Sequence, residues 1–113
     1  MASVDDLKKA KPGRLKLIDI RKKPDENQIP GSVRYSGEEL ENSNELPFEK
    51  DEHVVLYCGS GNSCSRIAQT LRDRGYANAE ALEGGYTAWK DAELPLEPIS
   101  ELRELPSSGV DSA

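Results

Sequence analysis

Aromatic residues are scarce in this chain, and so are cysteine and histidine. Only 5% of the 113 residues are aromatic, so a buried core must rest mainly on aliphatic side chains. Two cysteines and one histidine are too few for a disulfide-stapled miniprotein or a four-ligand zinc site. These shortages leave a single small domain that depends on its hydrophobic core, and a chain of this length can bury one without staples.

Positive charge is also in deficit. The chain has 15 Lys and Arg residues against 21 Asp and Glu residues, which gives a formal net charge of −6. Nucleic-acid binding and binding to anionic membranes both require clustered cations, so we expect neither partner. An anionic substrate would have to be attracted locally, because the field of the whole protein repels it.

Long hydrophobic runs are missing as well. The longest, such as Val54-Val55-Leu56, fall far short of the roughly 20 residues that a membrane-spanning helix needs. The first residues lack the basic segment and apolar stretch of a signal peptide. We therefore expect a cytoplasmic protein.

Short apolar strands alternate with helices along the chain. We expect strands over 15–20, 33–35, 53–57 and 79–82, and helices after Ser3, after Ser36, after the loop at 59–62 and over 86–91. This alternation favours an α/β domain with a small parallel sheet and helices on both faces. The domain is expected to span 1–98, and the polar segment 99–113 to form a flexible tail.

Cys58 follows the clearest strand and precedes a glycine-rich loop that leads into a helix. Ligands of open α/β sheets bind at the carboxyl ends of the strands, and backbone N–H groups in such a loop can hold an anion. This setting lowers the pKa of a thiol and makes it nucleophilic. From the residues alone, a nucleophilic Cys58 and a small buried hydrophobic Cys58 are equally open readings.

Four segments of the chain carry recognisable patterns. They are Leu17-Ile18-Asp19-Ile20-Arg21, Ile29-Pro30-Gly31-Ser32, the stretch from Val54 to Ser63, and Leu82-Glu83-Gly84-Gly85-Tyr86-Thr87-Ala88-Trp89. In this order they resemble the first strand, the I-P-G-A turn, the active-site strand and loop, and the closing L-x-G-G-x-x-A-W motif of single-domain rhodaneses. The resemblance covers roughly residues 4–97 and implies a rhodanese-like fold.

The resemblance also implies a chemistry, that of a thiosulfate sulfurtransferase. Cys58 would attack the outer sulfur of thiosulfate, release sulfite and carry the sulfur as a persulfide to cyanide or a thiol, a protein thiol included. No metal or organic cofactor is implied. The residues expected to bind donor and persulfide, chiefly through backbone N–H groups, are Gly59, Ser60, Gly61, Asn62, Ser63 and Cys64, with Arg66 as a candidate cation.

Three residues near the proposed nucleophile have more than one interpretation. Asp19 and Arg21 are expected to support the site through an ion pair that positions its loops, or Arg21 could contact the substrate directly. Cys64 begins the apolar face of a helix, which favours a packing role. The alternative is that Cys64 resolves an oxidised Cys58 by forming a disulfide.

Ser63 and Gln28 depart from the family pattern, and Ser63 leaves a second function class open. Many rhodaneses carry Arg or Lys where this chain has Ser63, and Gln28 stands where a histidine is common. With the unmatched tail, Ser63 favours the alternative of a non-catalytic rhodanese-like binding or regulatory module. A phosphatase or arsenate reductase is not expected, because those folds use a Cys-x5-Arg loop and this chain has Cys64 in place of the arginine.

Overall fold

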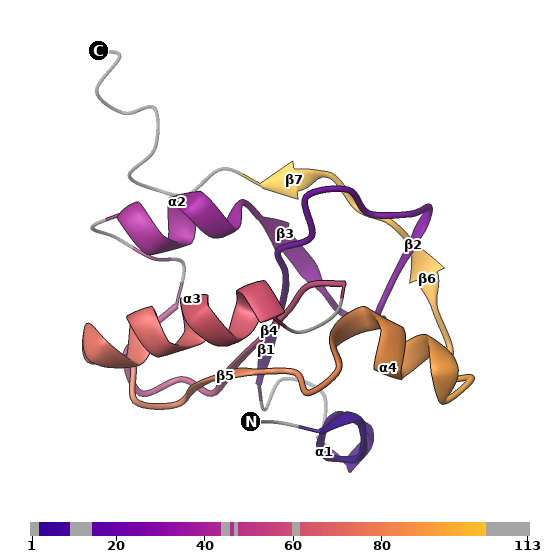
Figure 1. Cartoon of the computed structure of the whole chain (residues 1–113), viewed down its shortest axis with the longest axis horizontal. Coiled ribbons are helices and arrows are strands. Elements are labelled where there is room, and N and C mark those ends of the chain that lie inside the picture. Colours follow the sequence, from indigo (N-terminus) through magenta and orange to yellow (C-terminus); the bar gives the residue numbers. More distant parts are fainter. Residues whose placement is uncertain (1–2, 10–14, 44–45, 47, 60–61, 104–113) are drawn as a thin grey trace.

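A five-stranded parallel sheet forms the centre of the molecule (Figure 1). The computed structural model describes residues 3–9, 15–43, 46, 48–59 and 62–103, and of Asn62, Ser63 and Arg103 only the backbone. The strand order is β5-β4-β1-β3-β7. The bounds are Lys16–Asp19 for β1, Val33–Tyr35 for β3, Val54–Tyr57 for β4, Ala79–Ala81 for β5 and Leu102–Arg103 for β7.

Strands β1 and β4 lie side by side in the middle of the sheet, with Leu17 opposite Val55 and Ile18 opposite Leu56. All four residues of β4 are buried. Parallel strands covered on both faces are continuously apolar, which explains why 53–57 gives the clearest strand signal. Because β1 and β4 are inner strands, the carboxyl end of β4, and with it Cys58, lies near the middle of the side of the sheet where the parallel strands end.

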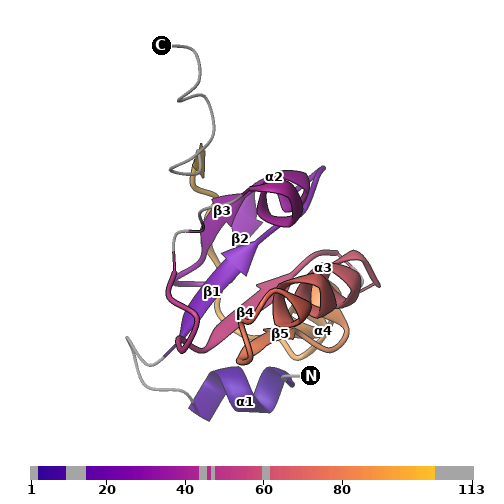
Figure 2. The same cartoon turned by 90° about the vertical axis from the view of Figure 1, so that its left-hand side faces the viewer.

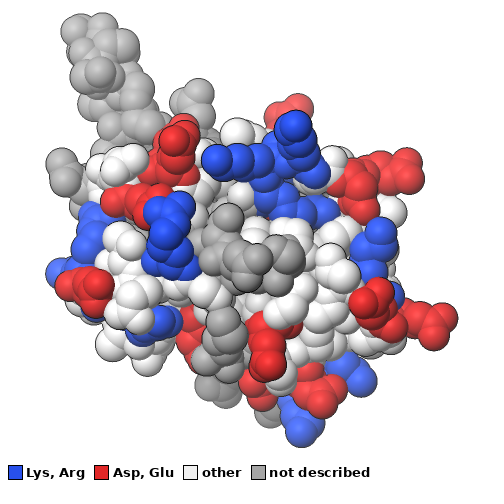
Figure 3. Space-filling model, in the orientation of Figure 1, with Lys and Arg blue, Asp and Glu red and all other residues white. Residues whose placement is uncertain are grey.

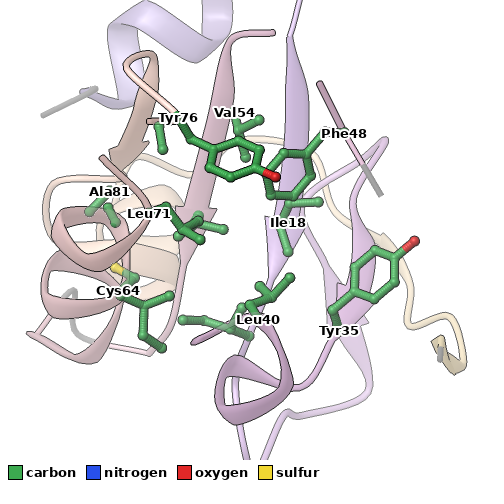
Figure 4. Packing of buried hydrophobic residues seen from close by; sticks show 14 of the residues in the cluster. Ile18, Tyr35, Leu40, Phe48, Val54, Cys64, Leu71, Tyr76 and Ala81 are labelled. Atoms are coloured by element: carbon green, nitrogen blue, oxygen red, sulfur yellow. The ribbon is translucent and has the colours of Figure 1, made fainter. Parts of the chain in front are cut away.

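Helices cover both faces of the sheet, as the sequence predicts. Figure 2 shows α2 (Gly37–Asn42) and α3 (Asn62–Asp73) along one side, where Leu40 and Leu71 join Ile18 in one core cluster (Figure 4). The other cluster joins α1 (Val4–Lys9) and α4 (Gly85–Asp91) to the opposite side chains of β1 and β4. Within the described ranges, none of these helices has the length and apolar character needed to cross a membrane.

Local signals set the ends of the helices. Ser36 accepts a hydrogen bond from the Glu39 amide at the start of α2, and Ser3 and Asp6 bond reciprocally at the start of α1. Gly75 follows α3 with φ 103°, the left-handed conformation that closes helices. Each of the four strands and four helices expected from the sequence is found, with strand ends shifted by at most one residue.

The segment after α4 returns to the sheet. β6 (Glu97–Pro98) pairs antiparallel with β2 (Asn27–Gln28), and β7 then joins β3 in parallel as the edge strand. Two-residue strands have no periodicity to detect, so the sequence did not predict them. The sheet thus continues beyond residue 98, the expected domain boundary, and the rest of the expected tail, 104–113, lies outside the described residues.

Candidate active site

Cys58 comes directly after β4 and is buried, with 7% of its surface exposed. The start of α4 fixes the backbone around it. The Tyr86 amide donates to the Cys58 carbonyl at 2.8 Å, and the Thr87 amide and hydroxyl donate to the Gly59 carbonyl at 3.1 and 2.9 Å. Tyr86 and Thr87 of the closing motif therefore hold the end of β4 in place, and we call these hydrogen bonds the latch.

A pocket of about 640 Å³ opens at Cys58. Its walls come from the residues that follow β1, β3 and β4, such as Ile20, Ser36 and Gly59, from α2 and α3, and from Leu102 of β7. This is the edge at which ligands of parallel sheets bind. A second hollow, of about 710 Å³, lies along β5 and α3, and no cysteine is among its described lining residues. The chemistry-bearing side chain therefore belongs to the smaller hollow.

Positive charge gathers in the Cys58 pocket despite the acidic composition of the chain. Its lining residues include five cations and two acids, and Figure 3 shows blue side chains clustered on this face. Arg66 is paired with Glu41, Nη1 to Oε2 at 2.7 Å, and is exposed. The other lining cations are Arg21, Lys22, Lys23 and Arg34, and the other lining acid is Glu38.

Asp19 and Arg21 form a buried ion pair beside the pocket. Arg21 Nη2 lies 2.6 Å from Asp19 Oδ2, and Nε donates to both carboxylate oxygens at 3.0 and 3.1 Å. Nη2 also donates to the Asn27 carbonyl at 2.8 Å. Burial disfavours the charge of Arg21, but hydrogen bonding and attraction to Asp19 outweigh it and raise the pKa of the guanidinium.

Aromatic rings complete the surroundings of Arg21. The guanidinium carbon lies 3.9 Å from the centre of the Tyr86 ring and 5.6 Å from that of Tyr57. The Tyr57 hydroxyl donates to Asp19 Oδ2 at 3.2 Å, and burial raises the pKa of this phenol. Since each guanidinium nitrogen of Arg21 has a protein acceptor, the geometry favours the positioning role over direct substrate contact.

Cys64 lies in the first turn of α3 and is fully buried in the core cluster (Figure 4). A hydrogen bond to the Cys58 side chain, burial and the negative charge of Cys58 together raise the pKa of the Cys64 thiol. The side chains of the two cysteines therefore lie within hydrogen-bonding distance of each other. A Cys64 that keeps its proton can donate an S–H hydrogen bond to a Cys58 thiolate.

Part of the predicted binding loop is not described. Ser60 and Gly61 lie outside the described residues, and of Asn62 and Ser63 only the backbone, at the start of α3, is described. The cradle of backbone N–H groups around the sulfur therefore stays a prediction. Gly59 is exposed and lines the pocket. Among the described residues, no group of His, Cys, Asp and Glu side chains is suited to hold a metal ion.

The sequence reasoning missed several residues that line the pocket, namely Lys22, Lys23, Arg34 and Leu102. Lys22 and Lys23 directly follow the predicted first strand, and the rule that ligands bind at carboxyl strand ends could have drawn attention to them. Leu102 gave no signal, because it belongs to the segment expected to be a tail.

The chain matches the rhodanese-like domain family over residues 3–92. It therefore belongs to this family, as the four motifs indicate. A solved rhodanese-like domain from the Alr3790 protein of Anabaena sp. has the same fold, with a TM-score of 0.76 over 88% of this chain and 79% of that chain at 23% identity.

Curated relatives include sulfurtransferases at modest identity. The human thiosulfate:glutathione sulfurtransferase is 30% identical over 96 residues, covering 72% of this chain and 84% of that protein. The thiosulfate sulfurtransferase GlpE of Haemophilus influenzae is 32% identical over 85 residues, covering 72% and 78%. The uncharacterized protein slr1261 of Synechocystis sp. is 39% identical over 69 residues, or 57% of this chain, and the match spans only 38% of that longer protein.

Proposed function

We propose that this protein is a sulfurtransferase that carries sulfane sulfur on Cys58 and takes it from thiosulfate. The single observation that carries the proposal is the position of Cys58, directly after the carboxyl end of the buried inner strand β4 and on the wall of a pocket lined with cations. Family membership and the named activities of two relatives support it.

The reaction has two nucleophilic steps. The Cys58 thiolate attacks the outer sulfur of thiosulfate, the S–S bond of thiosulfate breaks, and sulfite leaves with the electron pair. Cyanide or a thiolate then attacks the outer sulfur of the Cys58 persulfide, and the Cys58 thiolate leaves. Electrons and atoms balance without an oxidant or a cofactor.

Local charge supports an anionic donor. Neither Lys22 nor Lys23 has an ion pair within the described part of the chain, so both ammonium groups are free to attract thiosulfate toward Cys58. Arg66 is paired with Glu41 and supplies less net charge than the sequence suggests.

A comparison of Cys58→Ser with Cys64→Ala tests the proposal. We expect thiosulfate treatment of the native protein to add one sulfur atom to Cys58, detected by mass spectrometry, and thiocyanate to form from cyanide. Cys58→Ser should abolish both signals, because it removes the nucleophile, whereas Cys64→Ala retains it. Equal thiocyanate formation by native protein and Cys58→Ser would rule out this role of Cys58.

A non-catalytic binding module is the second candidate, favoured by Ser63 in place of a loop cation. Such a module would show no added sulfur after treatment with thiosulfate, even with both thiols reduced. The mass measurement therefore separates the two functions before any acceptor is chosen.

A further inference from the structure

The segment that follows the family match forms one wall of the Cys58 pocket. The match ends at residue 92, whereas β7 places Leu102 opposite Arg34 and on the pocket surface. Leu102 is 52% exposed and is the one large hydrophobic side chain among the described residues that is exposed. Since Leu102 lines the same pocket as Cys58, its side chain can contact a ligand bound there.

Gln28 holds this wall in place. Its side chain is buried, with 1% exposed, and both ends of the amide bind the C-terminal segment. Oε1 accepts hydrogen bonds from the amide and the hydroxyl of Ser100, each at 3.0 Å, and Nε2 donates to Glu97 Oε2 at 2.5 Å. Because a buried amide is costly when unpaired, these bonds fix the path of the segment that carries Leu102.

Arg34 joins the wall to the cations. Its Nη1 donates to the Ser100 carbonyl at 3.1 Å, while its Nε is buried and has no hydrogen-bond partner among the described residues. The Asp19 carboxylate lies 3.9 Å from that nitrogen and is already bound by Arg21. Because Asp19 is shared by two arginines, it only partly offsets the positive charge of Arg34, and this charge favours an anionic ligand such as a carboxylate in the pocket that Arg34 lines.

The size of the pocket points to an organic ligand. Its volume of about 640 Å³ falls within the range of roughly 300–1,000 Å³ typical of sites for organic molecules. Thiosulfate and cyanide are small inorganic ions that leave most of this space empty. The ligand that fills it must combine an apolar part for Leu102 with negative charge for Arg34 and the neighbouring lysines.

We propose that Leu102 is a specificity-determining residue that selects an organic thiol bearing carboxylate groups as sulfur acceptor, with Gln28 as the positioning residue for its wall. The inference rests on the proposed function and names the acceptor of that reaction. The acceptor thiolate attacks the outer sulfur of the Cys58 persulfide, the S–S bond breaks, and Cys58 leaves as the thiolate. The acceptor departs as a persulfide.

A single-turnover experiment tests this inference on the full chain. The protein is loaded with thiosulfate, desalted, and mixed with glutathione, glutathione diethyl ester or cyanide, and loss of the added sulfur is followed by mass spectrometry. The ester keeps the thiol and the peptide body but loses the carboxylate charges, and cyanide is the internal reference. We expect the native protein to react faster with glutathione than with the ester.

Leu102→Ala should lower the ratio of the glutathione rate to the cyanide rate about fourfold, since the half-exposed side chain loses the contact of about one methyl group with the acceptor. Gln28→Leu should lower the same ratio by a similar factor. The double variant should lose little more than either single variant, because both act through one wall. Leu96→Ala is the matched control, since it truncates a leucine of the same segment that does not line the pocket.

The outcomes separate the two proposals. Absence of sulfur loading in the native protein overturns the proposed function itself. Loading followed by equal glutathione-to-cyanide ratios in Leu102→Ala and the Leu96→Ala control overturns the role of Leu102. Equal rates with glutathione and its ester overturn the selection of carboxylates. If Gln28→Leu fails to fold, as a thermal melt would show, Leu102→Ala still decides the case.

Discussion

At the scale of single residues, the strongest constraint near the site is the polar network around Tyr57. This side chain is fully buried, and its hydroxyl bonds to Ser32 Oγ at 2.8 Å, to Asp19 and to the Ile29 amide. A buried network with every member paired fixes side chains more firmly than packing alone. Tyr57 thereby connects the I-P-G turn to the ion pair that supports the pocket.

Tyr57→Phe should change how stability depends on pH. Burial raises the pKa of Tyr57 above its ordinary value of 10.0, so the folded protein holds this proton more tightly than the unfolded chain. The resulting stabilisation is complete below pH 10 and is lost as the pH rises beyond it. The variant should be less stable at pH 8 by about 1–3 kcal/mol, yet its stability should fall less between pH 10 and 11.5.

Urea unfolding at several pH values measures this difference. Cys64, whose pKa is also raised, contributes equally to both proteins and cancels in the comparison. Tyr35→Phe serves as the control, because it removes a hydroxyl outside the network. If the free energy of unfolding changed with pH in the same way for the native protein and Tyr57→Phe, the pKa of Tyr57 would be the same in the folded and unfolded states, and the prediction would be wrong.

Single residues were predictable from sequence where one position combines local signals. The position of Cys58 directly after a buried strand shows this, whereas its role as the nucleophile stays a prediction. The pairing of Asp19 with Arg21 also follows from their positions, two residues apart at a strand end. The role of Gln28 could not be predicted, because its partners Glu97 and Ser100 are 69 and 72 residues away. Polar contacts at such separations leave no periodic pattern in the sequence.

At the scale of secondary-structure elements, the joint between α4 and the end of β4 is decisive. Gly84 precedes α4 with φ 77°, a left-handed conformation that L-residues with side chains rarely adopt. A Cβ at this position would lie 2.6 Å from the Ala88 Cβ. Glycine is thus required twice over, by the backbone conformation and by the close approach of the next helical turn.

Gly84→Ala should therefore destabilise the protein by about 2 kcal/mol and also slow sulfur loading of Cys58. The second effect follows because a displaced α4 weakens the amide bonds to the Cys58 and Gly59 carbonyls. Thermal melts and the loading rate measured well below the melting temperature check the two effects separately. Glu83→Ala, an exposed neighbour, is the control, and loading at the native rate in Gly84→Ala would contradict the latch.

Elements of three or more residues were predictable because their pattern of apolar residues is set by which faces they bury. Helix α3 shows this, with Cys64, Ile67, Ala68 and Leu71 on one buried face. The strands β2, β6 and β7 were missed for the opposite reason. Each has two residues, and their pairing depends on distant partners rather than on a local pattern.

At the scale of the whole molecule, the charge around the Cys58 pocket is opposite in sign to the net charge of the chain. The chain carries −6 overall, yet cations outnumber acids around the Cys58 pocket. Composition gives only the sum of the charges, so it predicted repulsion of an anionic donor and could not place the compensating cations. At an ionic strength of 0.1 M, salt limits the distance over which exposed charges interact to about 10 Å. Within that distance of Cys58, the charges of the pocket residues contribute most to the electrostatic potential.

The double substitution Lys22→Glu/Lys23→Glu should slow sulfur loading from thiosulfate about tenfold at low salt. The difference in loading rate between the variant and the native protein should become smaller near 1 M salt, where exposed charges interact over only about 3 Å. Lys8→Glu/Lys9→Glu on α1, which packs on the opposite face, makes the same change in net charge. The loading rates of both double variants are measured by rapid quench at both salt concentrations. Equal slowing in the two variants would show that the net charge of the protein, and not Lys22 and Lys23 at the pocket, attracts thiosulfate.

The late position of β7 in the sequence also sets the order in which the parts of the site are made during synthesis. Strand β4 and its neighbour β1 are complete once Tyr57 has been made, and the latch follows with Thr87. The pocket wall waits longer, because Ser100 must reach Arg34 across 66 residues of chain and Leu102 comes later still. A nascent domain therefore acquires its nucleophile first and the wall that we propose selects the acceptor last.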